Sequence, residues 1–189
     1  MDAFATYEDL EARLNRVFSV DEQEWITTLL EDASTYLRED VIGLQVYPQT
    51  TATFTAWASN GEVVLPQQPV ASVGSVTQGG EDVEFTHRDG VLYLEDIDCD
   101  LPVSVTFTFG YLLPPDGLRR WACVLVSQTL TTLELNLGLS VGGLSSVALD
   151  DFRAAFADGG EQTGMSLSDR NVNLLRRQFN PGVYVGGSR

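Results

Sequence analysis

Residues 103–125 constrain the fold more than any other stretch of this chain. They begin VSVTFTF, an alternation of apolar and hydroxyl side chains that has the two-residue period of a strand with one buried face. Gly110 interrupts this period, and Pro114 and Pro115 exclude the interior of a strand or a helix. Asp116 follows as the predicted N-cap of an apolar helix. The segment therefore predicts a half-buried strand, a rigid turn and a helix in immediate succession.

Two capped helices are predicted within residues 1–45. Thr6 is the expected N-cap of the first, and Ser19 followed by Glu22 matches the capping box of the second. Apolar residues recur at helical spacing along both. They are Leu10, Leu14 and Val17 in the first helix and Ile26, Leu29, Leu30, Ala33 and Leu37 in the second. Because the link between the helices is short, we expect an antiparallel pair.

Residues 50–110 are rich in Thr, Val and aromatic side chains and predict a β-rich insert of about six short antiparallel strands. Asn60-Gly61 is the strongest hairpin signal in the chain, and Gly79-Gly80 marks a second hairpin. The runs expected to pair are 51–58 with 62–65 and 72–78 with 83–87.

Two further helices complete the predicted frame. Residues 115–137 are apolar nearly all round, which is typical of a helix buried on several sides. Ser166 with Asp169 predicts the cap of a last helix within residues 166–189. Residues 145–157 fit either a helix or a pair of strands. The chain is therefore expected to be a single α+β domain in which a helical frame carries the β-rich insert.

Charge is the unusual feature of the composition. The chain has 27 acidic and 11 basic residues, every basic one an Arg, and a formal net charge of −16. A field this negative repels nucleic acid and argues against a sequence-specific DNA binder. The bias of a high-GC or salt-loving host and an acid-lined passage for DNA are both open explanations. The candidate lining acids are Glu22, Glu24, Glu31, Asp32, Glu81, Asp82 and Glu84.

No motif with catalytic or metal-binding chemistry emerges. His87 is the one imidazole and is expected at the surface, and the two cysteines, Cys99 and Cys123, are expected to be reduced thiols. The D-x-D-x-D run that starts at Asp96 lacks the Gly and Glu of a calcium-binding EF-hand loop. We therefore expect no enzyme activity and no cofactor. No apolar run reaches the about 20 residues needed to cross a bilayer, and no secretory signal is expected.

The order of strand, Gly110-Tyr111, Pro115-Asp116 and helix resembles the head-to-tail adaptor proteins of long-tailed phages and related archaeal tailed viruses. The N-terminal FATYEDLEARLNRVFSVDEQEWITTLLEDASTYLRED resembles the two-helix start of the same family. The resemblance implies a virion protein of the neck, present in the host cytoplasm during assembly. It implies a ring of probably twelve copies beneath the portal that continues the DNA channel, and strands at residues 145–157. The insert is larger than in minimal adaptors.

The resemblance also implies the partners: the portal protein, the next neck or tail-completion (stopper) protein, other copies of the chain, and DNA only as passing cargo. Residues 166–189 carry four Arg against one Asp, so this is the one net-positive part of the chain. Residues 176–189 are the candidate portal-docking element, by adding a strand to a sheet edge of the portal. The candidate docking residues are Arg176, Arg177, Phe179, Val183, Tyr184 and Val185.

Two alternatives remain open. Arg176 and Arg177 also suit the last turn of a helix, where cations complement the helix dipole. The rival function is a carbohydrate- or receptor-binding β-module of a virion or secreted protein, with Trp57, Phe54 and Phe85 as its platform. At strand spacing, however, such aromatic side chains are more often part of a core.

Overall fold

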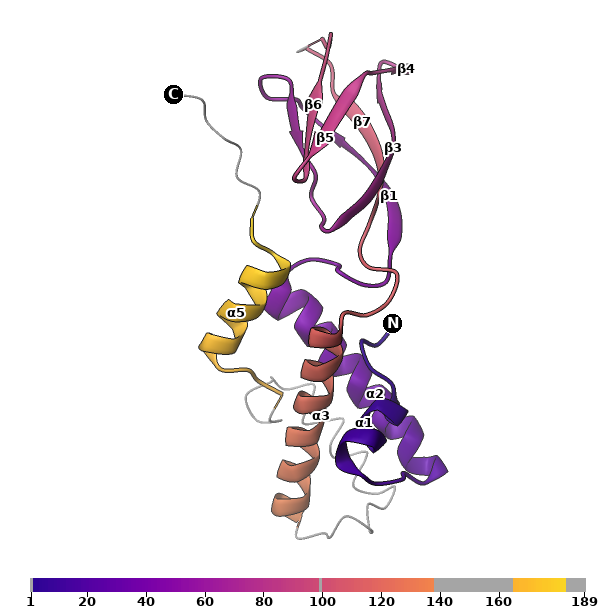
Figure 1. The fold of residues 1–189 in the computed structure, drawn as a ribbon, viewed down its shortest axis with the longest axis vertical. Helices are drawn as coiled ribbons and strands as arrows, with labels where there is room; N and C mark the ends of the chain where they lie inside the picture. The colour runs from indigo at the N-terminus through magenta and orange to yellow at the C-terminus, as the bar shows by residue number, and fades with distance from the viewer. Residues whose placement is uncertain (1, 99, 138–164, 183–189) are drawn as a thin grey trace. The chain divides into compact units, whose positions relative to one another are not determined.

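The computed structural model describes residues 2–98, 100–137 and 165–182. The fold class is α+β, as predicted. The chain divides into two compact units, one formed by residues 1–40 and 115–172 and the other by residues 41–114 and 173–189. The described helices of the first unit and the strands of the second each have their own packing, shown in Figure 1.

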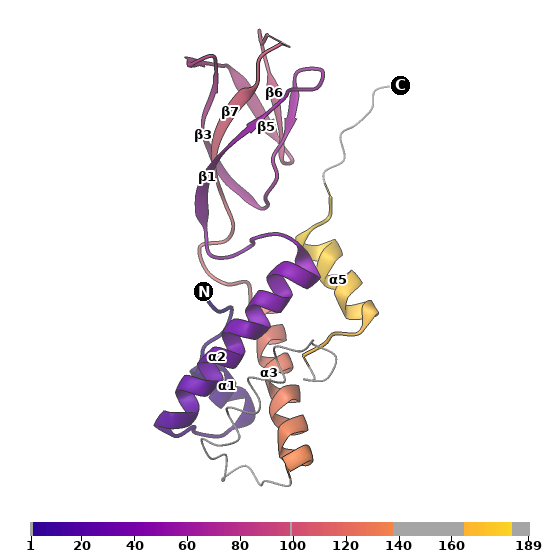
Figure 2. The same cartoon turned by 180° about the vertical axis from the view of Figure 1, so that it is seen from behind.

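Three described helices lie wholly within the first unit: α1 (Tyr7–Leu14), α2 (Val20–Tyr36) and α3 (Asp116–Leu137). Each contacts the other two, and Figure 2 shows them from behind. The predicted apolar stripe of α2 is buried along its whole length. α2 contacts α3, whose buried residues are Leu118, Ala122, Cys123, Leu125, Val126, Thr129 and Leu130. None of the described helices is long and apolar enough to span a bilayer.

Both predicted N-terminal caps are present. Thr6 and Asp9 form a capping box on α1, and Ser19 and Glu22 form one on α2. The expectation that Val17 belongs to the first helix is wrong. Asn15 adopts the left-handed conformation at φ 51° and ends α1 one residue after Leu14, so Val17 lies in the following loop and is 82% exposed.

The start of α3 differs slightly from the prediction. Asp116 is the first residue of the helix rather than its N-cap. The carbonyl oxygen of Pro115 accepts a 3.0 Å hydrogen bond from the backbone N–H of Arg119, so Pro115 occupies the cap position. Asp116 still places a negative charge in the first turn, where it suits the helix dipole.

A π-helical turn, η1 (Leu37–Ile42), follows α2 directly, and α5 (Asp169–Phe179) is the last described helix. The backbone carbonyl of Ser168 accepts the first bonds of α5, at 2.8 Å from the N–H of Asn171 and 3.0 Å from that of Val172. The predicted cap at Ser166 is therefore wrong by two positions, because Ser168 takes that place. The 145–157 segment lies outside the described residues.

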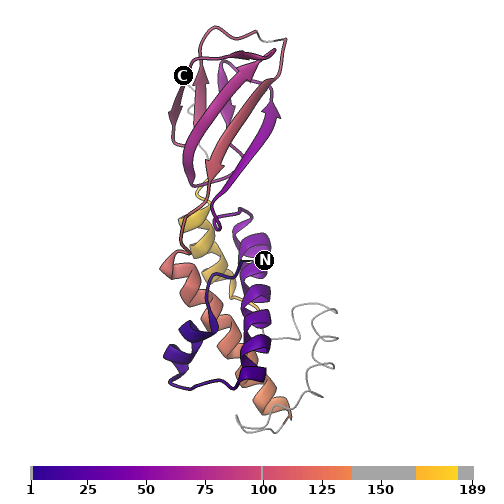
Figure 3. The same cartoon turned by 90° about the vertical axis from the view of Figure 1, so that its right-hand side faces the viewer.

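Seven strands are described in the β-rich unit, and Figure 3 shows them from the side. They are β1 (Thr50–Ala56), β2 (Glu62–Val64), β3 (Val70–Gln78), β4 (Glu81–Asp82), β5 (Phe85–Arg88), β6 (Val91–Leu94) and β7 (Val103–Phe109). They form two antiparallel sheets, one with the order β1-β7-β3-β4 and one with the order β2-β6-β5.

The two predicted hairpins are only partly present. A turn occurs at Asn60-Gly61, with an isolated bridge between Ser59 and Glu62, but β1 pairs with β7 and β2 pairs with β6. The chain therefore passes from one sheet to the other at this turn. Gly79-Gly80 does connect β3 to β4, but β4 stops after Asp82 and β5 joins the second sheet. In the first case β1 pairs with β7 instead, and in the second β5 pairs with β6.

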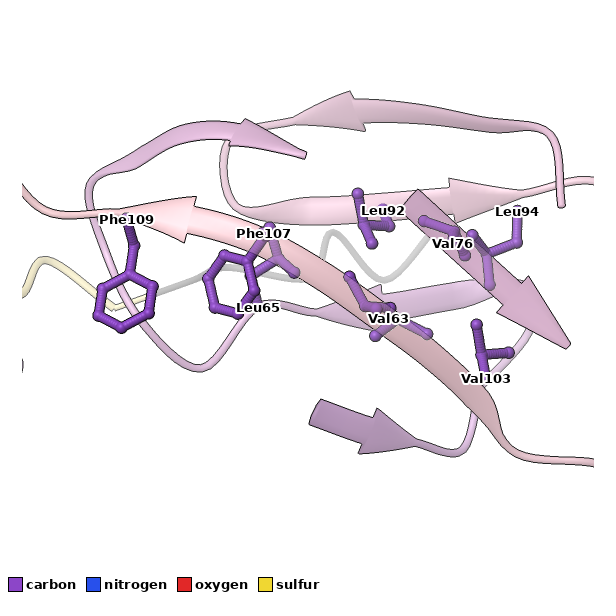
Figure 4. Close-up of a cluster of buried hydrophobic side chains, with 9 residues drawn as sticks. Val63, Leu65, Val76, Leu92, Leu94, Val103, Phe107 and Phe109 are labelled. Carbon is purple, nitrogen blue, oxygen red and sulfur yellow. The ribbon is translucent and has the colours of Figure 1, made fainter. Parts of the chain in front are cut away.

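The core of this unit lies between the two sheets. Alternate residues of β7 are buried, and Phe107 contacts Phe54 edge to face at a centroid separation of 5.5 Å. Figure 4 shows how the side chains of both sheets meet. The buried cluster comprises Val63, Leu65, Val76, Leu92, Leu94, Val103, Val105, Phe107 and Phe109. The sheets thus form a small β-sandwich.

Candidate acidic and basic surfaces

The acids of α2 lie largely opposite its buried stripe. Glu24 and Asp32 are exposed and Glu31 is half-buried. Glu24 and Glu31 are seven residues apart, about two helical turns, so they share one face. The predicted acidic face of α2 is therefore present on the surface of the helical unit.

Glu22 has a different role from the other acids of α2. Its carboxylate accepts hydrogen bonds of 2.8 Å from both the backbone N–H and the hydroxyl of Ser19, and the guanidinium of Arg16 also donates to it. Burial is the largest single effect on the pKa of Glu22 and would raise it. The Ser19 hydrogen bonds and the Arg16 charge together outweigh burial and hold that pKa below its ordinary value. Glu22 is thus a capping residue whose charge is already partnered.

Asp32 is the acid of α2 whose ionisation the fold opposes. Although the residue as a whole is exposed, partial burial of its carboxyl group, and then the charge of neighbouring Glu31, raise the pKa of Asp32 above its ordinary value. The two carboxylates are adjacent in sequence and repel each other. This acidic face is therefore maintained at some cost to stability.

The remaining candidate acids belong to the β-rich unit. Glu81 and Asp82 form the whole of β4 and are exposed, and Glu84 is exposed just beyond it. The backbone carbonyl of Glu84 accepts a 3.2 Å hydrogen bond from Glu95. Because β4 ends its sheet, its two acids also act as charges that discourage another strand from pairing there. The acids of α2 thus belong to the first unit and those around β4 to the second.

Arg176 has an internal partner that the sequence did not reveal. Its Nε donates a 2.7 Å hydrogen bond to the carbonyl oxygen of Val41, and the side-chain amide of Asn180 donates one of 2.9 Å to the carbonyl oxygen of Ile42. These carbonyls end η1, where helical carbonyl groups lack partners within the helix. The end of α5 therefore caps η1, and Arg176 has a structural role within the subunit.

The other predicted docking residues are placed as follows. Phe179 is 7% exposed, so its side chain contributes to internal packing. Arg177 is exposed. Val183, Tyr184 and Val185 lie outside the described residues.

The exposed face of α5 includes two residues that the docking prediction left out. Arg170, Leu174 and Arg177 are all exposed, and their spacing of four and three residues places them on one helix face. Leu174 is 52% exposed, which is high for an apolar residue on a helix that buries Leu175. Helical periodicity was the signal that could have found this face. We call Arg170, Leu174 and Arg177 the α5 face.

The residues considered for other chemistry are scattered. His87 is exposed, as predicted, and Cys123 is buried as a free thiol on α3. Within the described ranges, no group of three His, Cys, Asp or Glu side chains could hold a metal ion. Cys99 lies outside those ranges. Trp57 is 65% exposed, whereas Phe54 and Phe85 pack against the sandwich core.

No protein-family model matches the chain. No curated protein matches it either.

Proposed function

We propose that the protein is a head-to-tail adaptor of a tailed virus, a non-enzymatic virion protein that forms a ring beneath the portal and continues the DNA channel. The observation that carries the proposal most directly is the α5 face. It presents two arginines around an exposed leucine in a chain of net charge −16. An apolar anchor between two cations suits an acidic groove on a partner protein, because opposite charge guides the approach and the leucine is buried on contact.

The acidic surfaces support the proposal that the ring continues the DNA channel. Glu24, Glu31 and Asp32 give α2 a face of one sign, and β4 gives the sandwich another. An acidic wall repels passing phosphate and prevents DNA from binding as it moves, and salt weakens this repulsion. Glu22 contributes less to such a wall, because its carboxylate is held by Ser19 and Arg16.

Charge reversal on the α5 face tests the docking step. Arg170→Glu with Arg177→Glu should leave a folded subunit that no longer joins portal-bearing capsids. The matched control is Arg88→Glu, which reverses an exposed arginine of β5 with only an exposed, 3.5 Å ion pair to Asp89. The readout is electron microscopy of particles made with each variant in place of the wild-type protein. Normal tailed particles from the doubly reversed variant would refute docking through this face.

The C-terminal residues need a separate test. A chain that ends at Gly182 keeps the contacts of Arg176 and Asn180 with η1 and loses residues 183–189. If those residues add a strand to the portal, the shortened protein folds but does not attach. Deleting the whole gene should give heads that are filled or leaking and carry no tail. Tailed, infectious particles from the deletion would refute the adaptor proposal itself.

One observation favours a second candidate, carbohydrate binding by the β-sandwich. Trp57 directly follows β1 and is 65% exposed, and stacking on an exposed indole is a common way to hold a sugar ring. Phe54 and Phe85 do not extend this platform, because both pack against the core. Quenching or a shift of tryptophan fluorescence by added oligosaccharide, lost in Trp57→Ala, would support it. No response across a panel of glycans would exclude it.

A further inference from the structure

Strand β1 leaves one side of its backbone open. It is at the end of the four-stranded sheet, and no described strand pairs with its outer side. It runs for seven residues and pairs with β7 in continuous register, without a bulge. An edge strand of this length presents a row of unpaired N–H and C=O groups that can accept another strand.

The other edges of the two sheets carry features that oppose such pairing. β4 consists of two acidic residues, and β3 has two shifts in its register with β7. In the second sheet, β2 has only three residues and β5 ends in His87 and Arg88. Charges, bulges and short length are the usual means by which a protein guards an edge. The sequence of β1, TTATFTA, has no charge, proline, glycine or bulge.

The outer face of the same sheet is made of hydroxyl side chains. Three rows run across the three long strands in register, and no charged residue interrupts them. The rows are Thr51-Thr108-Ser72, Thr53-Thr106-Ser75 and Thr55-Ser104-Thr77. The hydroxyl oxygens of Thr51 and Thr108 are 2.8 Å apart, and those of Thr53 and Thr106 are 2.7 Å apart. Opposed threonines on this face therefore join strands by hydrogen bonds.

The sequence of β1 is self-complementary when two copies of the strand pair in antiparallel orientation. Antiparallel pairing with maximum overlap sets Thr50 opposite Ala56 of a second copy and puts Thr53 on the two-fold axis. Thr51 then faces Thr55 on the hydroxyl side. On the core side, half-buried Phe54 lies next to Ala52 of the other copy. Because each chain carries a charge of −16, copies repel each other wherever acids meet, and β1 brings no charge into the contact.

We propose that β1 binds β1 of a second copy of this chain, so that two four-stranded sheets join into one continuous antiparallel sheet. The contact is isologous and closes on itself, and the guarded edges stop further addition. Edge pairing alone buries less area than a standard stable interface, so the dimer is weak and depends on concentration. The inference does not rest on the adaptor proposal. A two-fold pair differs from a cyclic ring, so it describes the free protein in solution.

Sedimentation equilibrium of the full chain tests the proposal. Wild-type protein should approach twice the 20.7 kDa chain mass as its concentration rises. Thr53→Lys sets two like charges opposite each other at the axis and should remain a monomer at every concentration. The control is Thr106→Lys, which loses the same hydroxyl hydrogen bond and adds the same charge one strand away from the edge. It should still dimerise.

A rescue experiment tests the register itself. Thr53→Glu alone should also be monomeric, but a mixture of the Lys and Glu variants should form a heterodimer, because opposite charges then meet at the axis. Recovery on mixing also shows that both variants are folded. A wild-type protein that stays monomeric at the highest concentration would overturn the proposal. So would a Thr53→Lys variant that dimerises like the wild type, or monomeric variants that do not associate when mixed.

Discussion

The side chain of Arg176 holds the carbonyl oxygen of Val41, across 135 positions of sequence, with a hydrogen bond of 2.7 Å. Val41 is 1% exposed and lies near the end of η1, where its carbonyl would otherwise be without a helical partner. A cation at this end of a helix also suits the helix dipole. The contact ties α5 to the segment that enters the β-rich unit.

Because of this contact, Arg176 and Arg177, which were both predicted to dock to the portal, should contribute differently to the stability of the subunit. Arg176→Gln should lower the free energy of unfolding by about 1–3 kcal/mol, because a buried carbonyl loses a charge-assisted donor. Both arginines are exposed, but the bond to Val41 belongs to Arg176, so Arg177→Gln should change the free energy of unfolding by less than about 0.5 kcal/mol. Urea unfolding of the two variants compares them directly. Equal effects on stability would contradict the structural role assigned to Arg176.

Gly110 has a backbone conformation and surroundings that only glycine suits. Its φ is +88°, and a Cβ at this position would lie 3.0 Å from the carbonyl oxygen of Pro48. Gly110→Ala should therefore cost clearly more than the about 1–2 kcal/mol of left-handed strain alone. Gly79→Ala is the matched control, since Gly79 has φ +62° and no atom within 4 Å of an added Cβ. Chemical denaturation of both variants should rank Gly110→Ala as the more damaging change.

The features that the sequence predicted well are local ones. Capping boxes such as Ser19 with Glu22 depend on residues three positions apart, and the VSVTFTF alternation specifies its own buried face. The pairing of β1 with β7 depends on residues 47–59 positions apart, and no local pattern encodes it. For that reason the turns were predicted correctly while their partner strands were not.

The candidate site was predictable to a similar extent. The acids of α2 are on the surface because amphipathic periodicity sets the exposed face. The capping box already indicated that Glu22 has an internal partner, and this should have removed it from the lining acids. Contacts across the fold, such as that between Arg176 and Val41, cannot be derived from spacing.

Glu22 should make stability depend on pH in the acid range. Its folded-state pKa lies below the ordinary value of 4.5, so its ionised form stabilises the folded state fully above that value. This contribution is lost as the pH falls through the lowered folded pKa. Glu22→Gln should therefore be less stable than wild type at pH 7, and the difference should shrink in the acid range. Glu24→Gln removes an acid from the exposed face of the same helix and serves as the charge-matched control.

Thermal unfolding of the two variants at several pH values measures this effect. Glutamine can still accept hydrogen bonds in the capping box, so the comparison isolates the charge of Glu22 and its ion pair with Arg16. A constant difference between wild type and Glu22→Gln at every pH would show that ionisation contributes nothing.

Asp32 should have the opposite effect on stability. Because burial and the charge of Glu31 raise its folded-state pKa above the ordinary value of 3.8, its ionised form destabilises the folded state. The penalty is fully present above the raised folded pKa and disappears as the pH falls below the ordinary value. Asp32→Asn should thus be more stable than wild type at pH 7, by less than about 1 kcal/mol because the side chain is largely exposed.

The gain from Asp32→Asn should fade in acid, and it should shrink when salt screens the repulsion by Glu31. Glu24→Gln serves as the control, since it removes one acid from the same helix without relieving that pair. An Asp32→Asn protein that is less stable than wild type at pH 7 would contradict the assigned cause.

A fold that keeps a destabilising carboxylate on its surface is consistent with a use for the charge outside the subunit, as an acid-lined channel requires. Particles assembled from Asp32→Asn subunits should then retain or pass DNA less well than wild-type particles. Such a defect in a subunit that is itself more stable would link the destabilising carboxylate to the acid-lined channel.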